Sequence, residues 1–214
     1  MSEPIFRASS LGRLMTEPRT KSEGALSQGA KTYVRELAKQ EVFGVEFEFG
    51  SKETEKGILV EDESIALVNS VYSLSLVKNT ERRTSRGLTG EPDLVASDHG
   101  RDVKSAWSIK TFRAFQEEVE DQMYEWQCRA YMALWDLPVW YVDFCLVDTP
   151  ESLVGYEPVQ LHMVSHIPER LRVTSWRIER DADKEARIFE KIAAAQDYYR
   201  QVVREFDAAH KGVA

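Results

Sequence analysis

Two short segments, Gly90–Val95 and Arg101–Lys104, constrain the fold of this chain more than any other feature of its sequence. Both alternate or run apolar in the manner of β-strands, and the cluster Ser97–Gly100 between them is typical of a turn. The sequence therefore predicts a β-hairpin whose arms carry acidic and basic side chains.

The predicted hairpin places two carboxylates and a lysine on one face. With the four residues of the cluster in the turn, Ala96 pairs with Arg101 and Asp93 lies opposite Lys104. Because side chains on a strand repeat every two residues, Asp93, Asp102 and Lys104 then point to the same side of the sheet.

Two carboxylates beside a lysine suit a metal-dependent enzyme that cleaves phosphodiesters. Mg2+ prefers oxygen ligands and usually keeps several waters, and two carboxylates together with a substrate phosphate meet those needs. Lys104 can orient an attacking water or neutralise charge that develops on phosphorus. The alternative is a cross-strand ion pair on a solvated sheet face.

A helix is expected upstream, from Lys56 to about Leu76, because apolar residues recur there at helical spacing. These residues are Ile58, Ile65, Val68 and Tyr72. Glu61 lies one turn into this stripe, on the side that we expect to face the core. A carboxylate there is costly unless it is paired or bound to a cation, so Glu61 is a candidate third metal ligand. The alternative is a surface glutamate among acidic neighbours.

A second helix is expected from Phe115 to Trp135, with an apolar stripe that includes Val119, Met123, Trp126 and Ala130. Tyr124, Gln127 and Tyr131 are three and four residues apart, so they follow one neighbouring face of this helix. A glutamine and a tyrosine placed in this way could hold the scissile phosphate or the lysine. The alternative is that they are ordinary boundary residues of an amphipathic helix.

Four short motifs, taken in chain order, resemble the motif series of the PD-(D/E)xK nucleases. They are Gly57-x-x-x-Glu61, Gly90-x-Pro92-Asp93, Asp102-x-Lys104 and Gln127-x-x-x-Tyr131. The last motif is similar to that of the branch containing RecB-type nuclease domains, the iron-sulfur nucleases of CRISPR adaptation and the lambda-type, YqaJ-like phage recombination exonucleases. Each motif alone is a weak signal, and the ordered set is a strong one. The resemblance runs from about Phe6 to about Phe206.

The resemblance implies a role for each motif residue. Lys104 would position the nucleophile, and Gln127 would be a supporting contact. The acidic site residues would be Glu61, Asp93 and Asp102. The direct metal ligands would be Asp93, Asp102 and the backbone carbonyl of Val103, with Glu61 binding directly or through water. This chain departs from many relatives in having aspartate at position 102 and a longer interval between Glu61 and Asp93.

That longer interval contains a basic segment, Lys78–Arg86, which has no apolar residue although the net charge of the chain is −8. Its basic residues are Lys78, Arg82, Arg83 and Arg86. A basic loop that leads into the catalytic strand is suited to contacts with the phosphate backbone, which fix register without reading bases. The alternative is a solvated loop balanced by the acidic background.

The segment Phe6–Gly12 is similar to the short serine-containing opening of the lambda-type enzymes. This likeness implies that Ser9, or alternatively Ser10, approaches the substrate phosphate. Tyr131 is a further candidate for a DNA contact.

Length and composition fit one soluble globular domain that spans residues 1–214, with 43% hydrophobic and 30% charged residues. No apolar run approaches the length of a membrane span, and the first 20 residues lack the hydrophobic stretch of a signal peptide. We expect a protein of the bacterial cytoplasm. Cys128 and Cys145 are expected to be reduced and buried, and two cysteines cannot supply the four thiolates of an iron-sulfur cluster. This count favours the lambda-type branch.

The predicted fold class is mixed α/β, with a central mixed sheet flanked by helices. The resemblance implies the same architecture, a restriction-endonuclease-like core. Besides the elements above, helices are expected at about 30–40 and 182–209, and strands are expected at 140–146 and 171–178.

The first functional hypothesis is a Mg2+-dependent deoxyribonuclease, with Mn2+ able to substitute, that acts as an exonuclease on double-stranded DNA ends. The resemblance implies 5′ to 3′ polarity, a single-stranded product passed to an annealing protein, and a homo-oligomer in the form of a trimeric ring. One alternative is a structure-specific or restriction-type endonuclease on the same core. Another is a catalytically silent DNA-binding module, against which the intact set of acids and lysine argues.

Overall fold

The computed structural model describes residues 3–20, 22, 24–47 and 50–210. The strands are β1 (Phe6–Arg7), β2 (Arg83–Ser85), β3 (Leu88–Gly90), β4 (Leu94–Val95), β5 (Gly100–Ser105), β6 (Val139–Cys145) and β7 (Val173–Glu179). The α-helices are α1 (Leu11–Leu14), α2 (Gln28–Phe43), α3 (Lys52–Leu59), α4 (Glu61–Tyr72), α5 (Gln122–Trp135), α6 (Glu151–Val154) and α7 (Ala182–His210).

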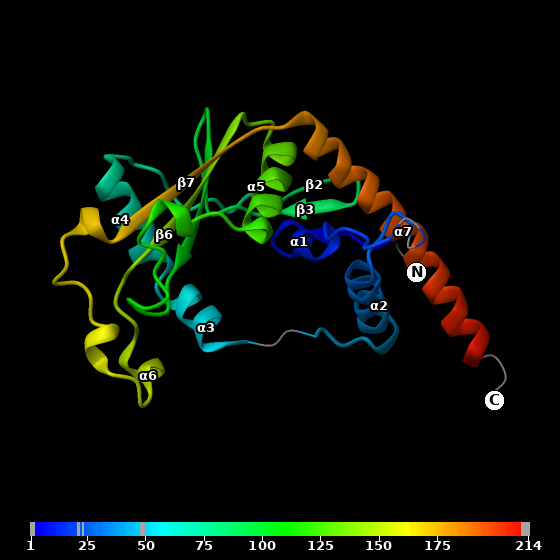
Figure 1. The fold of residues 1–214 in the computed structure, drawn as a ribbon, viewed down its shortest axis with the longest axis horizontal. Helices are drawn as coiled ribbons and strands as arrows, with labels where there is room; N and C mark the ends of the chain where they lie inside the picture. Colours follow the sequence, from blue (N-terminus) through cyan, green and yellow to red (C-terminus); the bar gives the residue numbers. More distant parts are fainter. Residues whose placement is uncertain (1–2, 21, 23, 48–49, 211–214) are drawn as a thin grey trace.

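The larger sheet has the strand order β4-β5-β6-β7, in which β5 and β6 run parallel and the outer pairs run antiparallel. A parallel pair requires a crossover, which α5 provides. On the α5 side, Trp140, Val142 and Phe144 of β6 join the main hydrophobic core. On the α4 side, Cys145 packs in a second core that includes Val68. The expected mixed sheet flanked by helices is confirmed (Figure 1).

Glycine is required where β5 begins. A Cβ on Gly100 would lie 2.2 Å from the Trp140 ring, so a side chain there would displace this fully buried tryptophan. A Cβ on Gly90 would lie 2.8 Å from the ring of Tyr131. Both glycines therefore let aromatic side chains pack directly against the backbone near the predicted hairpin.

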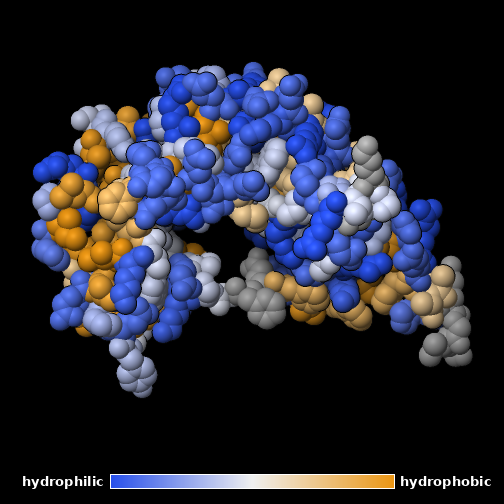
Figure 2. All heavy atoms as spheres, in the orientation of Figure 1, coloured by the Kyte–Doolittle hydropathy of each residue, from blue (hydrophilic) through white to orange (hydrophobic). Residues whose placement is uncertain are grey.

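A smaller sheet of order β1-β3-β2 lies beside the N-terminal helices. The long helix α7 runs along this side of the molecule and contacts α2 (Figure 1). Its buried stripe of Ile188, Ile192, Ala195 and Tyr199 is the stripe that the sequence predicts. In the same orientation, Figure 2 shows a hollow between the part that carries α3 and the part that carries α2. The chain is therefore folded as an arch.

The hairpin is confirmed, but its predicted register is wrong. Leu94, rather than Ala96, pairs with Arg101, and the turn closes with a 2.8 Å hydrogen bond from the Ala96 N–H to the His99 carbonyl. The pairing has therefore shifted by two residues, and Asp93 lies beyond the last β4 pair toward Asp102 rather than Lys104. An even shift preserves which side chains share a face, so Asp93, Asp102 and Lys104 still lie on the same side of the sheet as predicted.

The helix predicted from Lys56 to Leu76 is two helices that meet at Val60. The backbone of Val60 leaves the helical conformation, which separates α3 from α4 and makes Glu61 the first residue of α4. Ile65 and Val68 are buried as predicted, whereas Ile58 and Tyr72 are exposed. The prediction that this apolar stripe faces the core is therefore wrong for its first and last residues.

Two further boundaries differ from the sequence prediction. α5 begins at Gln122 rather than Phe115, because the Asp121 carboxylate accepts a hydrogen bond from the Met123 N–H and caps the helix there. Met123, predicted to be buried, is largely exposed. The basic segment is also not wholly a loop, since Arg83 to Ser85 form β2 and pair with β3.

Cys128 and Cys145 are both free and buried, as predicted. Within the described residues, no helix has the length and apolar character needed to cross a bilayer.

Candidate active site

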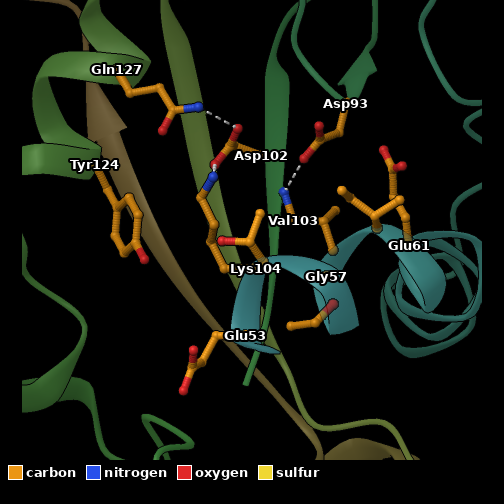
Figure 3. A pocket seen from close by; sticks show the side chains of 12 residues that line it. Glu53, Gly57, Glu61, Asp93, Asp102, Val103, Lys104, Tyr124 and Gln127 are labelled. Atoms are coloured by element: carbon orange, nitrogen blue, oxygen red, sulfur yellow. Dashed lines mark hydrogen bonds and ion pairs between the residues drawn. The ribbon is translucent and has the colours of Figure 1, made fainter. Parts of the chain in front are cut away.

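The first half of the site is held by the backbone of β5. Asp93 directly precedes β4, and its Oδ2 accepts a 2.6 Å hydrogen bond from the backbone N–H of Val103. β4 ends its pairing with β5 at Arg101, so the Asp93 side chain continues the contact between the two segments where the strand stops. Figure 3 shows the Asp93 carboxylate turned toward β5 by this bond.

The second half of the site is a chain of polar contacts that begins at Asp102. Oδ2 of this nearly fully buried residue lies 2.7 Å from Nζ of Lys104, two residues along the same strand. Oδ1 of Asp102 accepts a 3.1 Å hydrogen bond from Nε2 of Gln127, which also donates to the Tyr131 hydroxyl at 3.0 Å. α5 thus fixes the carboxylate from behind (Figure 3).

Charge repulsion and burial shape the titration of this site. Burial and the neighbouring Asp102 carboxylate raise the pKa of Asp93 to about 7, although Lys104 and the Val103 N–H oppose the rise. Burial alone would lower the pKa of Lys104, but the charges of Asp102 and Asp93 outweigh it and raise this pKa above its ordinary value. Lys104 is therefore a permanent cation beside two carboxyl groups near neutral pH.

Glu61 reaches the site from a different position than the sequence predicts. It stands in the first turn of α4, where a carboxylate interacts favourably with the helix dipole, and its side chain is partly exposed. Its Oε2 forms an ion pair of 2.5 Å with Nζ of Lys78. The charge of Glu61 also contributes to the raised pKa of Asp93, which places the two carboxylates within electrostatic reach of one another.

These groups line one cleft of about 410 Å3 between α3, β5 and α5. Five of the predicted site residues meet there together with the backbone of Val103: Glu61, Asp93, Asp102, Lys104 and Gln127. The α3 wall of the cleft is formed by Glu53, Thr54, Gly57 and Ile58, of which the sequence named Gly57 only as a motif residue and Ile58 only as a core residue, and did not single out the other two. A polar helix preceding a predicted helix carries no signal that it faces a site.

The donor set fits a divalent cation. Asp102 Oδ2 is buried and, despite its ion pair, has no aligned hydrogen-bond partner among the described residues. The repulsion between Asp93 and Asp102 is the kind that a shared cation relieves. Within the described ranges no three His, Cys, Asp or Glu side chains surround a common point. A hard cation held here would therefore complete its coordination with backbone oxygen, water or phosphate.

The predicted DNA contacts lie outside this cleft, apart from Lys78, which is held by Glu61 at its edge. Arg82 pairs with Glu91 at 2.8 Å, Arg83 pairs with Glu81 at 2.8 Å, and the guanidinium carbon of Arg86 lies 3.8 Å from the centre of the Phe189 ring. Ser9 is exposed in a short 3-10 turn, Ala8–Ser10, ahead of α1.

Tyr131 requires a correction. Its side chain is only 4% exposed, and its hydroxyl is engaged by Gln127. Such burial leaves no surface for a DNA strand, so the structure places Tyr131 behind Gln127 as a support. It is not a DNA contact.

Asn79 is a site-shaping residue that the sequence did not reveal. Its backbone N–H donates to the carbonyl of Asp93 at 2.7 Å, and its side-chain amide donates to the carbonyl of Pro92 at 3.0 Å. These bonds hold the segment that carries Asp93. In the sequence, an asparagine within the basic segment is typical of an ordinary turn. Only the tertiary contacts show that Asn79 holds the segment that carries Asp93.

Comparison with solved structures places this arrangement among known proteins. A phage related exonuclease from Haemophilus somnus is 34% identical, superposes with a TM-score of 0.90, and the match covers 96% of this chain and 97% of that one. An alkaline exonuclease from Laribacter hongkongensis, also solved with dAMP, has a TM-score of 0.70 at 16% identity, covering 98% of this chain and 95% of that one. At that identity the second likeness concerns the fold alone.

No family model and no curated protein matches the sequence. The first comparison nevertheless combines high identity with almost complete coverage of both chains. On that basis, this chain belongs to the YqaJ-like, lambda-type family of phage-related exonucleases within the PD-(D/E)xK nucleases.

Proposed function

We propose that this protein is a divalent-cation-dependent DNA exonuclease that resects double-stranded ends, and that Asp93, Asp102 and Lys104 form its catalytic centre. The observation that carries the proposal is the meeting of these three side chains in one cleft, at the positions of the family motifs. The cleft belongs to a chain that is 34% identical to a phage related exonuclease.

Asp93, Asp102 and the backbone carbonyl of Val103 would hold the cation, with Glu61 binding directly or through water. Mg2+ is the proposed natural ion, and Mn2+ is proposed to substitute. When bound, the cation would activate the attacking water and stabilise negative charge on the phosphate.

The side chains divide the remaining work. Lys104 stays protonated near neutral pH, so its ammonium donates hydrogen bonds that orient the water and offset charge on the phosphoryl oxygens. Gln127 fixes the rotamer of Asp102 through its 3.1 Å bond, and Tyr131 fixes Gln127 in turn. This support keeps the carboxylate in place before substrate arrives.

Contacts with the DNA backbone are proposed for Ser9, Lys78, Arg82, Arg83 and Arg86. The side chains of Arg82 and Arg83 are about half exposed, so they can exchange a carboxylate partner for a phosphate. By resemblance to the lambda-type enzymes, we propose 5′ to 3′ polarity and transfer of the single-stranded product to an annealing protein. The same resemblance supports a trimeric ring, and we also propose that the protein acts in the bacterial cytoplasm.

The test uses end-labelled linear DNA and covalently closed circular DNA, each incubated with Mg2+ or Mn2+. The wild type should degrade only the linear form. Lys104→Ala should lose roughly 100-fold or more in rate because a charged group at the reacting phosphate is removed. Lys110→Ala, which removes an exposed lysine a few residues beyond β5, is the matched control and should keep wild-type activity.

Each alternative gives a different result in this assay. Cutting of the closed circle would identify an endonuclease on the same core. Binding of DNA without cleavage in either metal would identify a silent DNA-binding module. Full activity of Lys104→Ala would overturn the assignment of the cleft.

A further inference from the structure

Helix α3 forms one wall of the active-site cleft, yet it has little apolar contact with the rest of the molecule. Every residue of α3 is described, and the one that is fully buried is a lysine, Lys56. The apolar Ile58 and Leu59 are 72% and 59% exposed. A helix of eight residues is not stable without tertiary support, so α3 depends on what Lys56 contacts.

Lys56 makes three hydrogen bonds to backbone carbonyls. Its Nζ donates to Ala106 at 2.6 Å, to Trp107 at 3.2 Å and to Val147 at 2.9 Å. An ammonium group has three N–H donors, so each donor has one acceptor. Without these bonds a buried ammonium would be strongly unfavourable, which ties the position of Lys56 to these carbonyls.

The three carbonyls lie just beyond the ends of β5, which carries Asp102 and Lys104, and of its neighbour β6. Ala106 and Trp107 directly follow β5, and Val147 follows β6. Because β5 and β6 are parallel, their carboxyl ends lie at the same edge of the sheet, close to Lys104. Lys56 therefore connects α3 to the edge where the catalytic strand ends.

The charge of Lys56 is maintained at neutral pH. Burial lowers its pKa to about 8, while the carboxylates of Asp148 and Glu63 oppose this effect. The amine is thus mostly protonated at pH 7, and all three donors are present.

α3 carries the anchor and the cleft wall on different sides. Glu53 and Gly57, one turn apart, face the cleft, and Figure 3 shows α3 passing beneath Lys104. α3 ends at Leu59, and Val60 alone separates it from Glu61, the first residue of α4. A displacement of α3 would open the cleft and move Glu61, whereas Asp93, Asp102 and Lys104 would stay on the hairpin.

We propose that Lys56 is a positioning residue that fixes α3 as the substrate-facing wall of the active-site cleft. It acts through three backbone carbonyls and does not touch the reacting atoms. Its effect on substrate rests on the proposed nuclease function, whereas its effect on the mobility of α3 does not.

The test compares Lys56→Met, which keeps the length but removes the donors, with Lys56→Gln, which keeps two N–H donors. Lys52→Met, at the exposed first residue of the same helix, is the matched control. Amide hydrogen exchange without DNA or metal should be about tenfold faster in residues 52–59 of Lys56→Met, with β6 unchanged. Lys56→Gln should lie between, and Lys52→Met should match the wild type.

Kinetics on linear duplex DNA form the second readout. In Lys56→Met we expect KM to rise about tenfold, with a smaller loss of kcat from the displacement of Glu61, because Asp93, Asp102 and Lys104 remain on the hairpin. A loss confined to kcat, with KM unchanged, would overturn the proposed role, since α3 would then not act as the substrate-facing wall.

Wild-type exchange rates in α3 of both Lys56 variants would overturn the proposal. A uniform loss of protection across α3 and β6 in both would also overturn it, because Lys56 would then stabilise the whole fold. If the wild type cleaves no DNA under any condition, the proposed function fails, and the exchange measurement still decides whether Lys56 anchors α3.

Discussion

At the scale of single residues, the two proposed catalytic carboxylates, Asp93 and Asp102, repel one another while hydrogen bonds from Val103 and Gln127 hold them in place. Burial and the neighbouring Asp102 carboxylate raise the pKa of Asp93 from 3.8 to about 7. Because the folded pKa lies above the unfolded value, proton binding stabilises the folded state, and this stabilisation is lost as pH rises toward 7. The metal-free protein should therefore become less stable between about pH 5 and pH 7.5.

Urea unfolding in the presence of a chelator, at several pH values in that range, measures this slope. We expect a loss on the order of 1 kcal/mol per pH unit, and Asp93→Asn should reduce it. Buried Asp143, whose pKa is also raised, leaves a residual slope of the same sign. Asp98→Asn, at an exposed aspartate of the same hairpin, should keep the wild-type slope. Equal slopes in wild type and Asp93→Asn would refute the assignment.

The sequence could predict the shared face of the three proposed site residues because side-chain parity on a strand tolerates an even shift in register. That is why Asp93, Asp102 and Lys104 share a face although Leu94 takes the place predicted for Ala96. It could not reveal Asn79, since its role depends on a contact across 14 residues to the Asp93 carbonyl.

At the scale of elements, the sheet is stabilised behind the catalytic strand by a buried ion pair. Arg101 Nη1 donates to both carboxylate oxygens of Asp143 at 2.9 Å, on the face opposite Asp102, and both side chains are almost fully buried. Removing one partner leaves a buried charge, so Asp143→Ala should cost roughly 3–5 kcal/mol in the free energy of unfolding.

Chemical denaturation checks this value. The matched control is Glu179→Ala, which breaks an exposed pair with Arg177 on neighbouring β7 and should cost less than about 1 kcal/mol. A loss of similar size in both variants would contradict the role given to the buried pair.

Long elements with a regular apolar pattern, such as α7 and β6, are predicted well from the sequence. The short ones are not: β3 pairs with β1 near the start of the chain, and β2 pairs with β3, and local pattern does not encode these contacts. The break at Val60 has the same origin, because α3 is positioned by the carbonyls that Lys56 reaches and not by its own apolar stripe.

At the scale of the whole molecule, an acidic protein is expected to act on a polyanion. With a net charge of −8, long-range attraction of DNA is weak, so the proposed function relies on local basic groups and on the proposed cation in the cleft. The hollow of the arch lies beside the cleft, since α3 borders both of them (Figures 1 and 2). Local contacts with a substrate could therefore form there. Mixed sheet topology and fold class follow from the order of elements, whereas the arch itself follows from tertiary contacts.

Asp93 and Asp102 are proposed to hold the cation that supports cleavage. The direct measurement is Mn2+ binding by electron paramagnetic resonance in wild type, Asp102→Asn and Asp98→Asn, followed by cleavage of linear duplex DNA in the same samples. We predict that Asp102→Asn loses about tenfold or more in Mn2+ affinity together with its activity, and that Asp98→Asn keeps both. Wild-type Mn2+ affinity in Asp102→Asn would contradict the account.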